Sequence, residues 1–99
     1  FKSLVLTLRH IHRSGLVHRD IKSDNIMISQ KCIPHILDFG FASKISGDLE
    51  NGLFASKLGT PAYMAPEIHH GAPYNGMNAD IFALGVILFQ MIIGRPPFE

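Results

Sequence analysis

Glycine and proline recur so often in the middle of the chain that residues 38–78 can form neither a long helix nor a long strand. A loop of this length is uncommon inside a compact domain and usually has a function or is mobile. Pro66 suits the first position of a helix, so we expect a single helical turn near residues 65–70. The other regular elements must therefore lie before and after this segment. Its breakers are Gly40, Gly47, Gly52, Gly59, Gly71 and Gly76, together with Pro61, Pro66 and Pro73.

The residues before this segment show two different apolar patterns. The first repeats at helical spacing and predicts an amphipathic helix that stops at Gly15. Residues 26–29 and 33–37 are short, rich in isoleucine and strand-like, and residues 30–32 could join them as a hairpin. Pro34 would be tolerated only on an edge strand. The helical repeat consists of Phe1, Leu4, Val5, Leu8 and Ile11.

The residues after the segment predict one long helix. Asn78 or Asp80 can cap it, and it runs to about Ile93 and stops at Gly94. Its apolar run, residues 81–93, is shorter than the roughly 18 residues that span a membrane. We therefore expect a buried core helix, no membrane segment, and an α+β fold that is mainly α-helical.

The composition indicates a folded domain, since 46% of the residues are hydrophobic. Nine basic and eight acidic residues leave a formal charge of +1, which gives no electrostatic reason to expect a nucleic-acid partner. Cys32 is the only cysteine, so an internal disulfide is excluded and a reducing compartment is expected. Since the residues after Phe1 show no signal-peptide pattern, we expect a cytoplasmic, intracellular protein.

Residues 18–25, HRDIKSDN, hold an acid, a base and an amide at fixed offsets between two apolar segments. Asp20 is a candidate general base, and Lys22 lies where an extended chain would point both side chains the same way. A cation at this place can neutralise the charge that develops on a phosphoryl group. Asn25 offers a neutral oxygen to a hard cation such as magnesium. The alternative is a turn whose polar groups only satisfy the backbone.

Two further motifs follow along the chain. Asp38-Phe39-Gly40 places an acid at a strand end, before a glycine that can take positive φ and so help to aim the carboxylate into a cleft. Residues 59–67, GTPAYMAPE, are punctuated by glycine and proline and end in a carboxylate. Each motif taken alone indicates no more than a strand end or a loop.

Together, in this order and spacing, the motifs resemble the signature set of protein kinases. HRD occupies residues 18–20 and is followed by Lys22 and Asn25, DFG occupies residues 38–40, and APE occupies residues 65–67. The resemblance covers essentially the whole chain. It implies part of a kinase-like large lobe, with a helix, a catalytic loop, a short hairpin, a long activation segment and a core helix.

The resemblance also implies chemical roles. It makes Asp20 the base that accepts the proton of the substrate hydroxyl, and Lys22 the lysine that steadies the γ-phosphate of ATP. Asn25 and Asp38 become the ligands of the Mg²⁺ that bridges the ATP phosphates. Thr60 matches a threonine that contacts Asp20 and Lys22 in serine/threonine kinases. The implied substrate is therefore a protein Ser or Thr hydroxyl rather than a Tyr hydroxyl.

Other positions match structural roles of the family. His18, Phe39 and Asp80 resemble a spine of packed residues that is anchored on the last helix. Gly40 completes the DFG motif. These roles are compatible with ordinary packing, because a histidine inside a core needs only satisfied hydrogen bonds.

Two more assignments concern the ligand and the activation segment. Met27 sits where the family lays an apolar side chain against adenine, with Ile87 and Met91 beneath it, although core packing explains the latter two equally well. Glu67 matches a carboxylate whose arginine partner would lie outside these residues. We therefore expect Glu67 to be a buried carboxylate without its partner, at a cost of roughly 3–5 kcal/mol.

Arg19 precedes Asp20, as it does in kinases whose activation segment is ordered by phosphorylation. Ser56 matches the usual acceptor position, three residues before Gly59. The hypothesis is that phosphorylated Ser56, modified by an upstream activating kinase, pairs with Arg19, with some help from Lys44. The alternative is that Ser56 is an ordinary loop serine.

The resemblance thus predicts that residues 1–99 are the central part of the large lobe of a serine/threonine kinase, without the small lobe and the C-terminal helices. We expect the fragment alone to be inactive and marginally folded, with its last helix poorly covered. A pseudokinase or scaffold that lacks the ATP lysine is one alternative. A small-molecule kinase is another, against which the GTPAYMAPE segment argues. The histidines His10, His12, His35, His69 and His70 form no evident ligand set for a metal and are expected at the surface or in packing.

Overall fold

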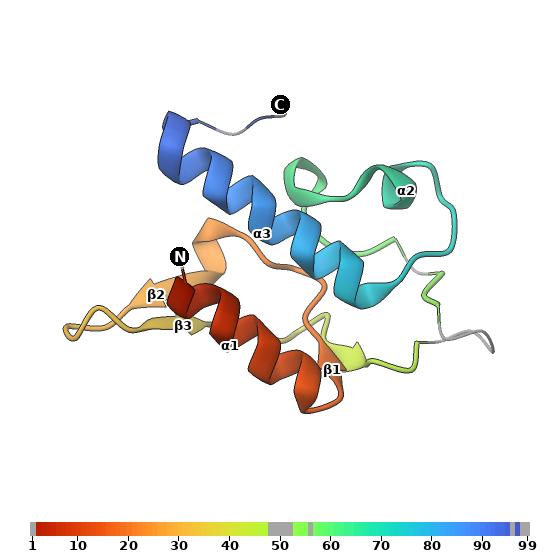
Figure 1. Ribbon diagram of the computed structural model, residues 1–99. Coiled ribbons are helices and arrows are strands. Elements are labelled where there is room, and N and C mark those ends of the chain that lie inside the picture. Colours follow the sequence, from red (N-terminus) through yellow and green to blue (C-terminus); the bar gives the residue numbers. More distant parts are fainter. Residues whose placement is uncertain (1, 48–52, 56, 96, 98–99) are drawn as a thin grey trace.

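The computed structural model describes residues 2–47, 53–55, 57–95 and 97 of the chain (Figure 1). Two long helices, α1 (Lys2–Arg13) and α3 (Gly76–Ile93), lie side by side and share a core, with two small sheets and the short helix α2 (Pro66–His69) around them (Figure 1). The architecture is the predicted mixture of helices with a small amount of sheet.

Helix α1 follows the predicted repeat at three of its positions, whereas Val5 is exposed and Phe1 lies outside the described residues. Leu4, Leu8 and Ile11 are its buried residues, and their spacing of three and four places them on one face of the helix. The backbone then turns at Gly15, where φ is +87°, a left-handed conformation that costs glycine little. The predicted stop is confirmed.

The predicted hairpin is confirmed as strands β2 (Ile26–Ile28) and β3 (Pro34–Ile36), which pair antiparallel. Pro34 is acceptable because a two-stranded sheet consists of edge strands only. A second pair, β1 (Leu16–Val17) with β4 (Ser43–Lys44), had no sequence signal, since two-residue strands show no alternation. This pair holds the start of the glycine- and proline-rich segment next to Leu16 and Val17, the two residues that precede residues 18–25.

The glycine- and proline-rich segment has only short elements in its described parts, as predicted. After β4 come a single antiparallel bridge between Phe54 and Tyr74, the 3₁₀ turn η2 (Pro61–Tyr63) and α2. Pro66 occupies the start of α2, which confirms the expected helical turn. The segment therefore takes its shape from tertiary contacts rather than from internal ladders.

Helix α3 begins earlier than predicted. Its N-cap is Asn75, whose side chain accepts the backbone N–H of Asn78, so the expected cap at Asn78 or Asp80 is wrong. The sequence misled because Gly76 is a poor helix former. A side chain at Gly76 would lie within 3.0 Å of Val17 and Phe54, so only glycine fits there. The predicted end is confirmed, since Gly94 has φ +87° and donates its N–H to the Gln90 carbonyl.

Two apolar clusters meet on α3. The first joins α1, the hairpin and the middle of α3, and the second joins β1, the Phe54 bridge, α2 and the start of α3. Residues 18–25 run between them, with Ile21 buried in the first cluster. The first cluster consists of Leu4, Leu8, Ile11, Ile21, Ile36, Ala83, Leu84 and Ile87, and the second of Val17, Phe54, Met64, Ala65, Ile68, Tyr74 and Ala79.

The expectation of a fully buried α3 is only half right. Its buried residues end at Ile87, and the last turns expose Met91, Ile92 and Ile93. The prediction that this helix is poorly covered in the chain is confirmed. By length and mean hydropathy alone α3 could also cross a membrane, but only 39% of its residues are buried here, and core helices of soluble proteins pass the same test.

Candidate active site

Asp80 on α3 holds the backbone of the loop of residues 18–25. Its side chain is 1% exposed, and its two oxygens accept the N–H groups of His18 and Arg19, each at 2.8 Å. Both donors come immediately before Asp20. A buried carboxylate is stable only when hydrogen-bond donors such as these satisfy its oxygens. Through these bonds, α3 fixes the backbone that leads into Asp20.

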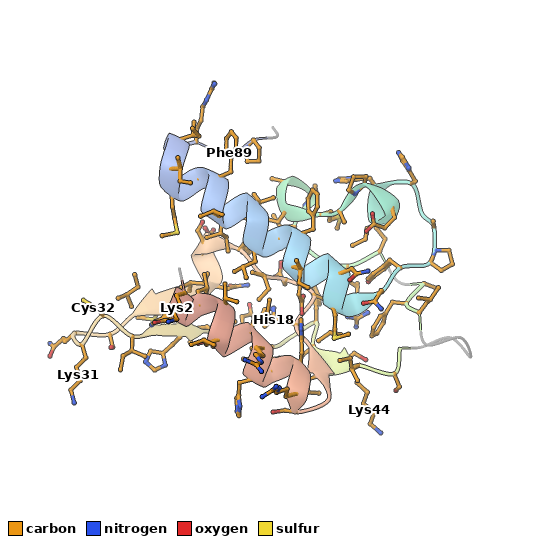
Figure 2. The ribbon with its side chains drawn as sticks, in the orientation of Figure 1. Lys2, His18, Lys31, Cys32, Lys44 and Phe89 are labelled. Carbon is orange, nitrogen blue, oxygen red and sulfur yellow. The ribbon has the colours of Figure 1, made fainter. Side chains whose placement is uncertain are left out.

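His18 links this loop to the strand that ends at Asp38. Its ring is fully buried, and Figure 2 shows it between the two long helices. Nδ1 accepts the N–H of Asp20 at 3.1 Å, so Nε2 carries the proton and donates to the Leu37 carbonyl at 2.9 Å. The ring also meets Phe39 edge to face at 4.8 Å. The expected packing of His18, Phe39 and Asp80 is thus present as a chain of contacts, although Phe39 itself is partly exposed.

Asp20, Lys22 and Thr60 meet although 38 to 40 residues separate Thr60 from the other two. The Thr60 hydroxyl donates to Asp20 Oδ1 at 3.0 Å, and Lys22 Nζ donates to the Thr60 oxygen at 3.0 Å. Nζ also lies 4.0 Å from Asp20 Oδ2. The two charged side chains are 11% and 24% exposed, so the group is held in place yet open to a reactant. A carboxylate, a hydroxyl and an ammonium fixed in this way can orient a hydroxyl and attract a phosphoryl group.

Asn25 is buried and turns its amide nitrogen towards Asp20. This nitrogen donates to the Asp20 backbone carbonyl at 2.8 Å, which directs the amide oxygen to the opposite side. The backbone carbonyl of Asn25 accepts the N–H of Leu37 at 2.7 Å, one residue before Asp38. An amide oxygen and a carboxylate are therefore carried by neighbouring backbone positions, and both are ligands that Mg²⁺ accepts.

The conformation of the DFG motif differs from the expectation. The positive φ is at Asp38, with +56°, and not at Gly40. Gly40 contributes in another way, because its N–H donates to Asp38 Oδ1 at 3.2 Å, and the absence of a side chain leaves room for this oxygen, which a Cβ would approach to 3.2 Å. The strained turn at Asp38 therefore aims the carboxylate, and Gly40 holds it.

Arg19 lies at the junction of three segments. Its backbone also takes a positive φ, +68°, and its Nε donates to the Phe41 carbonyl at 2.8 Å. Its guanidinium lies 4.5 Å from the centre of the Phe54 ring. Ser56 lies outside the described residues, and Lys44 is exposed on β4.

The family of the chain follows from a comparison with known proteins. The model of the protein kinase domain family matches residues 1–99. The chain belongs to the protein kinase family. The mixed fold, the contact of His18 with Phe39 and the contact of Thr60 with Asp20 agree with this membership.

Curated relatives of this kinase chain include serine/threonine kinases. The chain is 41% identical over 99 residues to testis-specific serine/threonine-protein kinase 5 of Mus musculus, and it covers 26% of that protein. It is 39% identical over 99 residues to CBL-interacting serine/threonine-protein kinase 7 of Arabidopsis thaliana, of which it covers 23%. It is 38% identical to serine/threonine-protein kinase GIN4 of Saccharomyces cerevisiae, of which it covers 8%. In each case all of the chain is matched, so it spans about a quarter or less of these relatives.

The apolar positions of the kinase chain separate into two kinds. Met27 is 60% exposed on β2, so its side chain is accessible to an apolar ligand. Ile87 is buried in the first cluster, and Met91 is exposed at the far end of α3. Of these three predicted residues, Ile87 thus has the core packing that the alternative reading proposed.

Glu67 is not buried, contrary to the expectation. It lies in the first turn of α2, and this four-residue helix buries only Ile68. A solvated carboxylate keeps its hydration, so the cost expected for a buried unpaired charge does not arise in this chain.

His12, expected only at the surface or in packing, also contacts Asp80, a link that was not predicted. Its Nε2 lies 2.8 Å from Asp80 Oδ2, and its side chain is 11% exposed, so it forms part of the support of the loop. Leu8, four residues earlier, is buried, and the helical repeat could have placed His12 on the same face. Among the described residues, no three His, Cys, Asp or Glu side chains come together as metal ligands.

A polar network beside the site was also missed. The Tyr63 hydroxyl donates to Gln90 Oε1 at 3.1 Å and lies 3.0 Å from the Ser23 hydroxyl. It connects the turn after Lys22 to η2 and to α3. Because Gln90 is neutral, the network places hydrogen-bonding groups near the site without adding charge.

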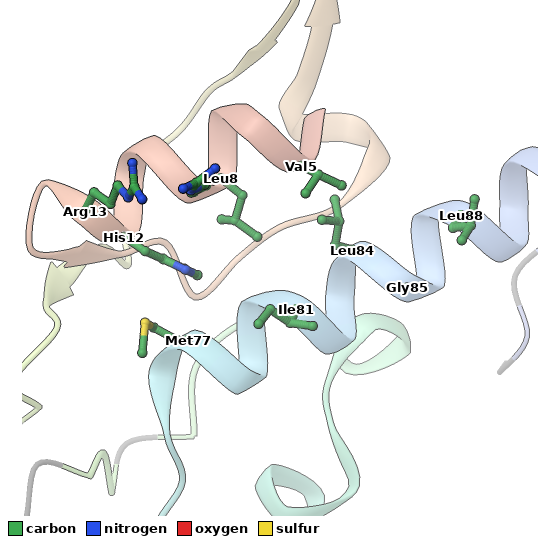
Figure 3. A pocket seen from close by; sticks show the side chains of 10 residues that line it. Val5, Leu8, His12, Arg13, Met77, Ile81, Leu84, Gly85 and Leu88 are labelled. Atoms are coloured by element: carbon green, nitrogen blue, oxygen red, sulfur yellow. The ribbon is translucent and has the colours of Figure 1, made fainter. Parts of the chain in front are cut away.

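The structure also has a hollow away from the predicted site residues. An apolar groove of roughly 660 Å³ lies between α1 and α3 and is lined by none of the predicted site residues (Figure 3). Its walls include Val5, Leu8, Met77, Ile81 and Leu84, with His12 at its edge (Figure 3). The candidate active site is identified by its polar geometry and not by the volume of a cavity.

Proposed function

We propose that the protein that contains this chain transfers the γ-phosphate of ATP to Ser or Thr hydroxyls of other proteins. The observation that carries the proposal is the three-residue contact among Asp20, Lys22 and Thr60, which unites the catalytic loop with the GTPAYMAPE segment. The membership of the kinase family and the serine/threonine kinases among the relatives support it.

Each side chain of this contact has a distinct task. Asp20 accepts a hydrogen bond from the substrate hydroxyl and takes its proton as the oxygen attacks phosphorus. Lys22 places its positive charge beside the transferred group, where negative charge must be stabilised. Thr60 holds both side chains with one hydroxyl, so neither is free to rotate away.

Asn25 and Asp38 would hold Mg²⁺, and their oxygens suit that ion. When bound, Mg²⁺ would supply the positive charge that lets a triphosphate approach the carboxylates of Asp20 and Asp38. The bond from Leu37 to Asn25 keeps the two ligand positions adjacent, and the bond from Gly40 keeps the Asp38 carboxylate aimed. Met27 offers an exposed apolar side chain to the adenine of ATP.

Residues 1–99 form the central part of the large lobe in this proposal. The glycine-rich loop, the ATP lysine and the helices that cover α3 would come from other parts of the protein, which fits the small share of each relative that the chain spans. The chain alone is then inactive. The protein acts inside the cell, in the cytoplasm.

An upstream kinase would regulate the same site by phosphorylating Ser56. The guanidinium of Arg19 lies over Phe54, which is two residues before Ser56 in the sequence, so a cation is already near the acceptor segment. A phosphate adds about −1.5 to −2 charges and forms strong hydrogen bonds with arginine. Lys44, on the neighbouring strand β4, adds a second positive charge.

The proposal is tested with the full-length protein, ATP, Mg²⁺ and a serine peptide. Replacing Asp20→Asn should lower kcat by about 10²–10⁴-fold, as loss of a general base does. Asp24→Asn is the matched control, because Asp24 carries the same charge on the same loop but is exposed, and it should leave kcat unchanged. A wild-type protein without phosphate transfer, or an Asp20→Asn variant as active as the wild type, would contradict the proposal.

A further inference from the structure

Phe54 is a large side chain of the glycine- and proline-rich segment that is fully buried. It exchanges two backbone hydrogen bonds with Tyr74, at 2.8 and 2.9 Å, and the two rings stack with their centres 5.8 Å apart. It also packs so closely on Gly76 that a Cβ there would lie 2.7 Å from the Phe54 ring. The start of α3 therefore fixes the position of this ring.

The same ring contacts the residue that precedes Asp20. The Arg19 guanidinium carbon lies 4.5 Å from the ring centre, a distance typical of a cation–π contact. The Arg19 Nε donates to the Phe41 carbonyl, and its backbone N–H donates to Asp80. Three separate segments thus hold Arg19, through Phe54, Phe41 and Asp80. Of these, the Phe54 ring is the contact that the glycine- and proline-rich segment contributes with a side chain.

The backbone of Arg19 needs such support. Its φ of +68° lies in the left-handed region, which a residue with a side chain occupies only when its surroundings hold it. Its carbonyl oxygen packs on Gly59, where a Cβ would be 2.8 Å away, and Gly59 precedes Thr60. A shift of Arg19 would therefore move both Asp20 and the backbone that carries the hydroxyl bonded to Asp20.

We propose that Phe54 is a positioning residue for phosphoryl transfer, which acts through Arg19 to keep Asp20 aligned with Thr60. The inference rests on the proposed function and adds a residue to it. None of these contacts uses a phosphate, so the ring holds the catalytic loop in the unmodified chain as well. Ordinary core packing of Phe54 would make a different prediction, because a core residue would contribute to stability without any specific coupling to Arg19.

A double-mutant cycle on kcat of the full-length protein distinguishes the two roles. Phe54→Leu keeps an apolar side chain but removes the ring face, and Arg19→Lys keeps the charge but removes the Nε donor and the planar group. Each should lower kcat roughly tenfold, as a small displacement of a catalytic group does, with little change in KM for ATP. The double variant should be no slower than the slower single variant.

The control is Ile68→Val, which trims a buried residue of the same cluster on α2 and should leave kcat unchanged. If Phe54→Leu stays within twofold of the wild type, or if the two losses multiply, the proposal is wrong. If Phe54→Leu does not fold, Phe54→Met, which is unbranched and of similar size, takes its place in the cycle.

A spectroscopic readout separates this inference from the proposed function. In the full-length protein labelled with ¹⁵N-arginine, the Arg19 Nε–H resonance should be shifted by the ring and slowed in exchange by its bond to Phe41. It should move in Phe54→Leu and stay in place in Ile68→Val. If the wild type transfers no phosphate, the proposed function is wrong. If the Arg19 resonance does not move in Phe54→Leu, the contact between Arg19 and Phe54 is wrong, whatever the activity.

Discussion

The catalytic loop, residues 18–25, and the last turns of α3, residues 88–93, are opposite in character. In the loop, the backbone N–H groups of His18 and Arg19 have buried acceptors supplied by this chain. In the last turns of α3 the side chains of Met91 and Ile92 are 62% and 72% exposed, although their composition is that of a core. Within the described residues, the loop has these polar partners, whereas the side chains of Met91 and Ile92 remain exposed.

The difference shows that polar geometry and apolar burial have separate requirements. Hydrogen bonds are directional and short, so a few residues from α3 and the GTPAYMAPE segment are enough to define the loop. Apolar burial grows with area, so covering α3 needs whole elements packed against it. An exposed apolar face of this kind marks a surface that another part of the protein covers in our proposal.

The strongest way to break the comparison is to remove Asp80. Asp80→Ala takes the acceptor from the N–H groups of His18 and Arg19 and the partner from His12, so the free energy of unfolding should fall by about 3–5 kcal/mol. Urea unfolding of the full-length protein measures this. Asp24→Ala, an exposed carboxylate, should change it by less than about 0.5 kcal/mol. If Asp80→Ala lowers the free energy of unfolding by less than about 1 kcal/mol, the buried bonds do not hold the loop.

The three-residue contact can be tested at its hydroxyl. Thr60→Val keeps the shape but removes the donor to Asp20 and the acceptor of Lys22, and should lower kcat about 10- to 100-fold, as loss of a hydrogen bond to a charged group does. Thr60→Ser keeps the hydroxyl and should retain most of the activity. Equal kcat values for the valine and serine variants in a steady-state assay would show that the Thr60 hydroxyl does not contribute to catalysis.

A third test asks whether the catalytic loop needs phosphorylation of Ser56 for full activity. After treatment with an activating kinase, Ser56→Ala should be about tenfold less active than the wild type, which is the size of an ordinary coupling free energy. Ser46→Ala, at an exposed serine of the same segment, is the control. If activation and phosphate incorporation survive in Ser56→Ala, the acceptor lies elsewhere.

The smallest effect is expected on the exposed half of α3. In the 99-residue chain, Ile92→Ser should change stability by less than about 0.5 kcal/mol and should reduce binding of a dye that reports apolar surface. Ile87→Ala is the matched buried position, where a loss of about 2–5 kcal/mol is expected. A cooperative melt of the chain with no dye binding would show that the last turns are covered after all.

The sequence predicted the elements whose signals are local. Apolar repeats and left-handed glycines gave α1 and the end of α3, and Pro66 gave α2. The start of α3 was misplaced because Gly76 is chosen by its contact with Val17 and Phe54, which no local signal reports. The pairing of β1 with β4 and the Phe54–Tyr74 bridge escaped for the same reason, since both join segments distant in sequence.

The site divides in the same way. The order and spacing of the motifs resemble those of protein kinases, and this resemblance predicted Asp20, Lys22 and Thr60 as site residues. The structure places the three in contact. The bond from His12 to Asp80 spans 68 residues and depends on how α1 packs on α3, so the sequence could not supply it. The positive φ at Asp38 was assigned to its glycine neighbour, because backbone strain is imposed by the fold and not by residue preference.

The most direct test of the central claim is the identity of the phosphorylated residue. The full-length protein is given ATP, Mg²⁺ and three peptides that differ only in a Ser, Thr or Tyr acceptor, and the products are mapped by mass spectrometry. The account predicts phosphate on the Ser or Thr peptide, none on the Tyr peptide, and loss of transfer in Asp20→Asn. Absence of transfer from the wild type, or transfer to Tyr as readily as to Ser and Thr, would contradict it.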